Sequence, residues 1–256
     1  MRAAISKAEI ESEVSSRFVD AFKVHEKPQV AVIPTGIAEV DSLIGGLPRG
    51  AITEIFGSAS SGRTSFLISA LAHATTHDEV CVLIDTSDAF DPVSAAGAGL
   101  TLERLLWIRC AANVEHAFKA TDLLLQGGGF GIVVLDIGDV VGTDARRIIS
   151  SWWYRFRRVV ENTPTAFLVI AEDSCVRSCA SLALKLDRES DVWSSVSQTS
   201  ESDIYTRPTL VPSSITTGPT HSNLLNSIKL QISRHKPVHL GASETHFRVC
   251  ARVNPA

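Results

Sequence analysis

The sequence lacks the features that mark membrane, secreted and duplex-DNA-binding proteins. Although 45% of its 256 residues are hydrophobic, no apolar run approaches the roughly 20 residues that cross a bilayer. The opening stretch MRAAISKAEIESEVSS has no apolar core like that of a signal peptide, so we expect a cytoplasmic protein without a membrane partner. Its formal net charge is −4, whereas duplex-DNA binders are usually basic. Any nucleic-acid role must therefore depend on a local patch or a partner.

Cysteine is also sparse and irregularly placed. The five cysteines are Cys81, Cys110, Cys175, Cys179 and Cys250. Cys175 and Cys179 are four positions apart, but no second Cys or His pair completes a zinc site. We expect small buried or idle thiols rather than a metal centre.

Apolar strands alternate with helical segments through the middle of the chain. VCVLID at 80–85, LLWIRC at 105–110, GIVVLDIGDV at 131–140 and TAFLVIAED at 165–173 are the strands. This alternation predicts an α/β fold with a mostly parallel sheet and helices on both faces. Three later strands, SLALKLDRE, SIKLQISRHK and THFRVCARV, have no helices between them and predict an antiparallel extension of the sheet edge.

Two segments differ from this core. Residues 1–33 are predicted to form a helix, over 3–23, and a linker, so the core covers 34–253. Within it, residues 194–223 are rich in Ser, Thr and Pro and predict a flexible surface loop, with a phosphorylation segment as the alternative.

The stretch GSASSGRT at 57–64 predicts a phosphate-binding loop for ATP. It lies between the strand AITEIF and a helix, the context in which backbone N–H groups and a helix N-terminus bind phosphate. The predicted nucleotide-binding residues in it are Gly57, Ser60, Ser61, Gly62, Arg63, Thr64 and Ser65. Thr64, together with Asp136 at the end of GIVVLD, is predicted to hold Mg²⁺.

Arg63 stands where such loops carry lysine. Its planar fork is larger than an ammonium group, which favours weak nucleotide binding and poor positioning of the γ-phosphate. The alternative is that Arg63 pairs with an acid and the pocket holds nothing.

The stretches PTGIAEVDSLIGGLPRGAITEIFGSASSGRTS, VCVLIDTSDAFDPVSAAGAGL and GIVVLD resemble the ATPase core of RecA recombinases. The resemblance covers about residues 34–253, and among RecA relatives the chain is most similar to ImuA-type proteins, short members found in bacterial translesion-mutagenesis cassettes. It implies a RecA-like fold and a role in DNA repair.

The resemblance also shows departures in the nucleotide site. The water-activating glutamate of the family corresponds to Ser87, leaving Asp85 and Asp88 as substitute candidates. The adenine-stacking tyrosine corresponds to Ser94, whereas Asp91, which would face the adenine, is retained. Glu172 replaces the glutamine that senses the γ-phosphate. We therefore predict at most an inefficient ATPase.

The family's DNA-binding loops are short here and offer only Arg177. Arg234 and Lys236 match two cations that RecA relatives present to ATP on a neighbouring subunit, with a solvated strand edge as the alternative. The helix predicted over 144–161 carries Arg147, Arg155 and Arg158, which form either a DNA or partner contact or a solvated face.

The favoured hypothesis is a non-catalytic RecA-like accessory protein of damage-induced, SOS-type mutagenesis that binds RecA or a translesion polymerase, with the N-terminal helix as a second contact. The enzyme alternative is a slow ATPase that depends on single-stranded DNA. The third hypothesis is direct DNA binding by the arginines of the helix.

Overall fold

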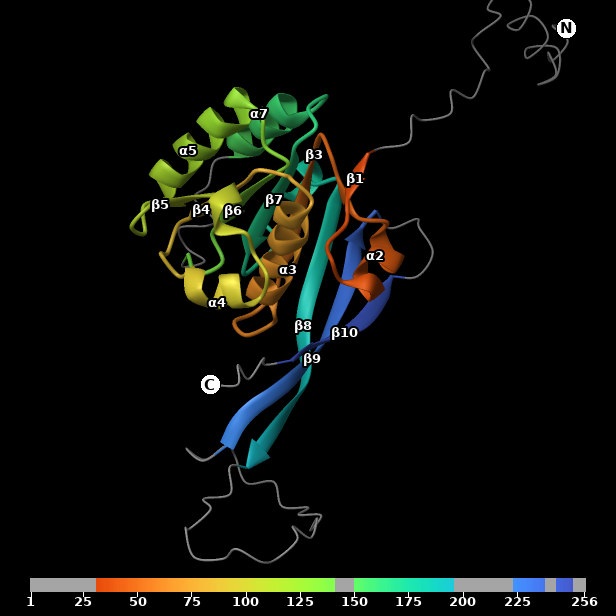
Figure 1. Ribbon diagram of the computed structural model, residues 1–256. Helices are drawn as coiled ribbons and strands as arrows, with labels where there is room; N and C mark the ends of the chain where they lie inside the picture. Colours follow the sequence, from red (N-terminus) through yellow and green to blue (C-terminus); the bar gives the residue numbers. More distant parts are fainter. Residues whose placement is uncertain (1–30, 141–149, 196–222, 238–242, 251–256) are drawn as a thin grey trace, which may run out of the picture. The chain divides into compact units, whose positions relative to one another are not determined.

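An eight-stranded sheet organises the chain from Ala31 onward (Figure 1). The computed structural model describes residues 31–140, 150–195, 223–237 and 243–250. The strands of this sheet are β3 (Ala51–Phe56), β4 (Cys81–Asp85), β5 (Leu105–Arg109), β6 (Ile132–Asp136), β7 (Ala166–Ala171), β8 (Leu182–Ser195), β9 (Asn223–Lys236) and β10 (Glu244–Cys250). Their spatial order is β10-β9-β8-β3-β7-β6-β4-β5.

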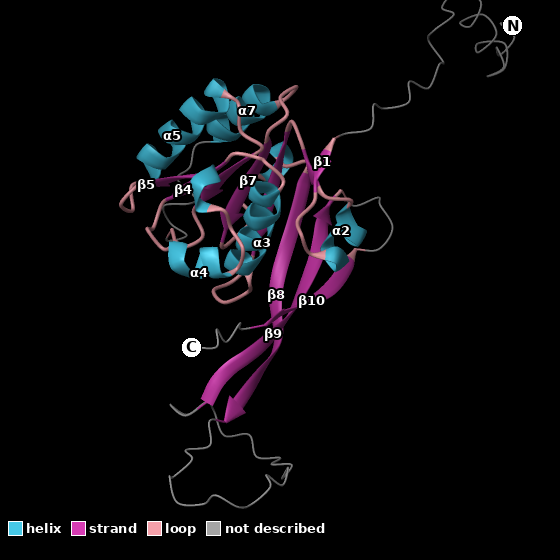
Figure 2. Cartoon of the chain, viewed as in Figure 1, coloured by secondary structure: helices cyan, strands magenta, loops and turns pink. Residues whose placement is uncertain are grey.

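The sheet is parallel from β5 to β8 and antiparallel beyond it (Figure 2). β8 is the turning point, because it pairs parallel with β3 and antiparallel with β9. The prediction of a mostly parallel α/β sheet with antiparallel edge strands is thereby confirmed. A small second sheet joins β1 (Val32–Ile33) to β2 (Leu47–Pro48).

Helices cover both faces of the parallel part. The helices are α2 (Ala38–Ile44), α3 (Arg63–Thr76), α4 (Pro92–Gly97), α5 (Val114–Gly127) and α7 (Ser150–Val160), with 3₁₀ turns at Leu102–Arg104 and Arg177–Cys179. Phe66 of α3 belongs to the core on one face, and Phe118 of α5 packs with Phe156 of α7 in the core on the other. β4 and β7 are buried along their whole length, which explains their unbroken apolar sequences.

β8 and β9 are longer than their apolar patterns predict. They extend to Ser195 and from Asn223, whereas the patterns indicate strands only over 181–189 and 227–236. Antiparallel partners satisfy each other's backbone groups, so polar residues can continue a strand that has little to bury. The predicted N-terminal helix and residues 196–222 of the predicted loop lie outside the described residues. Within the described part, no helix is both long and apolar enough to span a membrane.

Candidate nucleotide-binding site

The loop between β3 and α3 is tightly enclosed by the strands behind it. A Cβ atom at Gly57 would lie 2.2 Å from the carbonyl oxygen of Leu186, and one at Gly62 would lie 2.2 Å from Cδ1 of Leu230. Gly62 is also left-handed, with φ 90°, and stands immediately before the first residue of α3. A side chain at either position would therefore disturb the conformation of the loop. The first backbone N–H groups of α3 have no acceptors within the helix and point out of its N-terminus.

The serines and the threonine of this loop differ in exposure. Ser60 is exposed with φ 60°, Thr64 is exposed, and Ser65 is half-buried. Ser61 is only 1% exposed, and its hydroxyl has no hydrogen-bond partner. A buried hydroxyl without a partner costs free energy. It is therefore a polar group that a bound anion could satisfy.

Asp85 and Asp136 end neighbouring strands and pair in register across β4 and β6. The Asp136 Oδ1 atom accepts the N–H of Gly138 at 2.9 Å. Burial raises the pKa of Asp136 to about 6, a shift to which the charges of Asp85 and Asp139 add and which Arg63 opposes. The predicted metal-binding acid is therefore close to its titration range at neutral pH.

Arg63 turns toward the end of β6. It is 9% exposed, and its Nη1 atom donates to the carbonyl oxygen of Gly138 at 3.1 Å. Among the described residues, the hydrogen bond of Arg63 goes to a backbone carbonyl two residues beyond Asp136 rather than to an acid. The cavity beside these groups measures only about 40 Å³.

The two acids that could replace the missing base are engaged elsewhere. Asp85 is 2% exposed and accepts hydrogen bonds from the backbone N–H groups of Asp88, Ala89 and Phe90 and from the indole N–H of Trp107. Asp88 forms a two-pronged ion pair with Arg109, whose hydrogen bonds hold the pKa of Asp88 below its usual range. Both carboxylates are thus engaged in hydrogen bonds within the chain, and a role for either in activating water stays a prediction.

Asp91 caps a helix. It precedes α4 and accepts the N–H groups of Val93 at 3.2 Å and Ser94 at 3.0 Å, together with the Ser94 hydroxyl. These hydrogen bonds, that of the Ser94 hydroxyl first, lower the pKa of Asp91. A contact between Asp91 and adenine stays a prediction.

Glu54 is a buried acid that the sequence pattern hid, because it lies inside the apolar strand AITEIF. It is 0% exposed and accepts hydrogen bonds from the Ser174 hydroxyl at 2.8 Å, the Cys175 N–H at 2.6 Å and the Val176 N–H at 2.8 Å. The short segment after β7 is thereby fixed to the sheet. Glu172, which begins it, is exposed, and its carbonyl accepts the N–H of Gly57.

The predicted trans cations make contacts within the chain. Arg234 is 8% exposed and donates from Nη1 to the carbonyl of Leu43 at the end of α2, at 2.8 Å. Lys236 donates to the carbonyl of Arg177. Both cations thus make contacts within the chain, and their contact with a neighbouring subunit stays a prediction.

One of the arginines predicted to contact DNA or a partner, on helix α7, also makes contacts within the chain. Arg155 of α7 forms a two-pronged ion pair with Asp122 of α5, with both N···O distances at 2.6 Å, while Arg158 is exposed. On the same helix Phe156 is fully buried and Trp153 is 3% exposed, whereas Trp152 is half-buried. Arg147 lies outside the described residues.

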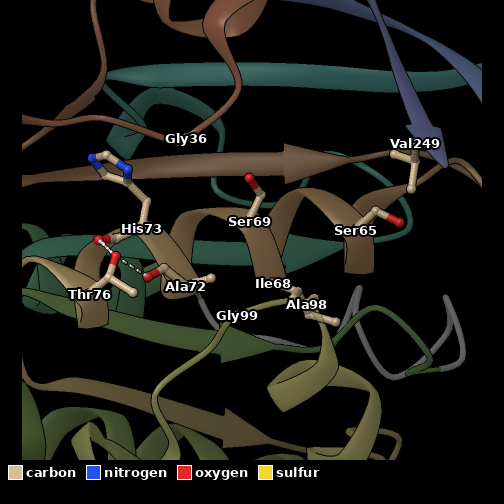
Figure 3. A pocket seen from close by; sticks show the side chains of 10 residues that line it. All are labelled: Gly36, Ser65, Ile68, Ser69, Ala72, His73, Thr76, Ala98, Gly99 and Val249. Carbon is tan, nitrogen blue, oxygen red and sulfur yellow. Dashed lines mark hydrogen bonds between the residues drawn. The ribbon is translucent and has the colours of Figure 1, made fainter. Parts of the chain in front are cut away.

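A larger groove of about 440 Å³ runs along the outer side of α3 (Figure 3). Ser65 lies at one end of it, and Thr76 and His73 lie at the other. Ala98 and Gly99, which follow α4, and Val249 of β10 form its walls. The groove thus begins at Ser65, in the first turn of α3, and is far larger than the cavity beside Arg63.

The family model described as the RecA N-terminal domain matches residues 2–145. The chain belongs to this family. RecA proteins from Cutibacterium acnes and from its strain DSM 16379 / KPA171202 are each 37% identical to it over 113 residues, which are 43% of this chain and 32% of each relative. The chain thus spans about a third of the length of these curated relatives. The RecA-like fold predicted from the sequence is confirmed.

Proposed function

We propose that this RecA-family chain is a cytoplasmic accessory protein of DNA repair that binds nucleotide without efficient hydrolysis. In the finer form of the proposal it resembles ImuA-type proteins and docks on RecA or on a translesion polymerase during SOS-type, damage-induced mutagenesis. The observation that carries the proposal is the engagement of both candidate bases, Asp85 and Asp88, around a serine at position 87. Phosphoryl transfer to water needs a group that positions or deprotonates that water.

The retained loop supports nucleotide binding as a remaining property. Its two enclosed glycines, the helix N-terminus after Gly62 and the unpartnered Ser61 hydroxyl together fit the oxygens of a phosphate group. The groove along α3 begins at Ser65 and has the volume of an ordinary small-molecule pocket, about 300–1,000 Å³.

The β5 edge of the sheet supports docking of a protein partner. Among the described strands β5 ends the order, so one side of its backbone has no neighbouring strand in this sheet. Leu106 within β5 is 44% exposed, and Leu102 just before it is 37% exposed. An edge strand with exposed apolar residues is a surface that a partner can extend by strand addition.

Phosphate release, measured with and without single-stranded DNA, tests the catalytic part of the proposal. We expect no turnover above that of the Asp136→Ala variant under either condition. Turnover that DNA stimulates and that Asp136→Ala abolishes would instead support the slow ATPase.

Co-purification with RecA and with a translesion polymerase tests the docking part. Leu106→Asp should weaken capture by about tenfold, because it places a charge on an apolar contact. Leu123→Asp is the matched control, since Leu123 is 71% exposed but lies on α5. Capture of neither partner by the wild-type chain would contradict the proposal.

A further inference from the structure

The guanidinium of Arg63 occupies the space between the start of α3 and the end of β6. A Cβ atom built at Gly138 would lie 3.0 Å from Arg63 Nη1 and 3.1 Å from Asp136 Oδ1. The cation and the carboxylate therefore both lie close to the same point. Arginine stays protonated at all physiological pH values, so this point carries a permanent positive charge.

The Arg63 charge repels a second cation at this place. Mg²⁺ requires near-octahedral oxygen ligands at about 2.0–2.1 Å and usually keeps several waters. The residues that would hold it are Thr64 and Asp136, and Arg63 lines the same cavity of about 40 Å³ beside them. In the described part of the chain, no group of three or more His, Cys, Asp or Glu side chains is placed to hold a metal ion.

The anion-binding half of the site is intact. α3 has 14 residues, and its first amides follow the left-handed Gly62. The unpartnered Ser61 hydroxyl lies across the loop against Gly57, where a Cβ would be 2.7 Å from it. This hydroxyl and the helix N-terminus are independent features, and both favour a phosphate oxygen as the missing partner.

We propose that the loop binds the polyphosphate of a nucleotide without a divalent metal, with the Arg63 guanidinium supplying the countercharge that Mg²⁺ would otherwise supply. A planar fork can donate two parallel hydrogen bonds to phosphate oxygens, which a lysine ammonium cannot do. The inference rests on the proposed nucleotide site and specifies its chemistry. It is independent of the docking part of the proposed function.

Titration of the full chain with a fluorescent ATP analogue, in EDTA and in excess MgCl₂, tests this inference. For the wild-type chain we expect the two dissociation constants to agree within about threefold. Arg63→Ala should weaken binding in EDTA by about tenfold or more, the loss typical of a charge-assisted hydrogen bond. Wild-type binding that is tenfold or more tighter with Mg²⁺ would overturn the inference, as would no binding at millimolar ligand under either condition.

Two further variants separate the chemistry from a folding defect. Arg63→Lys keeps the charge but frees space, so its binding should become tighter with Mg²⁺ than in EDTA, by about tenfold. If Arg63→Lys stays as indifferent to Mg²⁺ as the wild type, Arg63 does not exclude the metal and the inference fails. Arg157→Lys, at an exposed position of α7, is the matched control and should bind as the wild type does. Thermal melting of each variant confirms that it is folded.

Failure of this test leaves the docking proposal standing. A chain that requires Mg²⁺, or that binds no nucleotide, can still be captured by RecA or by a polymerase. Capture that fails while metal-free binding succeeds would overturn the docking proposal alone.

Discussion

Asp85 and Asp136 end adjacent strands and pair in register, yet the two carboxylates differ in how many hydrogen bonds they accept from the chain around them. Asp85 accepts four N–H groups from the turn after β4 and from Trp107. Asp136 accepts one backbone N–H within two residues, and burial raises its pKa to about 6.

The difference separates a structural acid from a site acid. Asp85 stabilises the turn that leads to α4 by satisfying its backbone donors, so its side chain is part of the fold. Asp136 has few donors and is desolvated, so its charge costs free energy that the nearby Arg63 offsets only in part. Position at a strand end therefore does not determine which acid is free for chemistry.

Of these variants, Asp85→Asn should change the free energy of unfolding most. The amide can accept hydrogen bonds at only one oxygen, so its NH₂ group would face donors that the second carboxylate oxygen now satisfies. We expect the free energy of unfolding to fall by about 4 kcal/mol. Urea unfolding followed by tryptophan fluorescence measures this loss, and a loss near zero would show that water replaces the lost acceptor.

Asp136→Asn should instead raise the free energy of unfolding at neutral pH. The pKa of Asp136 is higher in the folded chain than in the unfolded chain. Its contribution to stability is therefore greatest below about pH 4 and is lost as the pH rises through 6. The variant removes this loss, so at pH 7 it should be more stable than the wild type by about 3 kcal/mol. Unfolding curves at pH 4, 5, 6 and 7 measure it, and an equal pH slope in both proteins would contradict the assignment.

Glu54→Gln should have a smaller effect. Both backbone N–H groups go to Oε1, which the amide keeps, and the Ser174 hydroxyl can rotate to accept from the new NH₂ group. We expect a loss of about 1 kcal/mol in the free energy of unfolding. Glu54→Ala, which leaves three donors without an acceptor, should lose clearly more, and equal losses would mean that these hydrogen bonds are not what Glu54 contributes.

Arg109→Gln should have the smallest effect. Its partner Asp88 is the residue whose backbone N–H donates to Asp85, but the ion pair itself is exposed. Exposed pairs contribute little, so we expect unfolding curves that coincide with those of the wild type. A clear destabilisation would show that the hydrogen-bond network of Asp85 extends to Arg109.

The sequence predicts the sheet, its helices and the place of the phosphate loop, because these depend on apolar periodicity and on glycine. It cannot predict the partners of buried polar groups. Glu54 is enclosed by an apolar strand, and its donors lie 120–122 positions later in the chain. The direction of Arg63 depends on the carbonyl of Gly138, 75 positions away. Arg234 is read as a surface cation because strand alternation does not reveal that its guanidinium reaches the end of α2.

The anchoring of residues 174–176 by Glu54 limits how the protein can transmit a signal. A conformational switch needs two states separated by only a few kcal/mol, so that a ligand can shift their populations. Three hydrogen bonds to a fully buried carboxylate hold this segment in a single state. Arg63, by contrast, holds the Gly138 carbonyl through one hydrogen bond, which a phosphate could draw away. We therefore expect a bound nucleotide to displace the end of β6 more readily than the segment after β7.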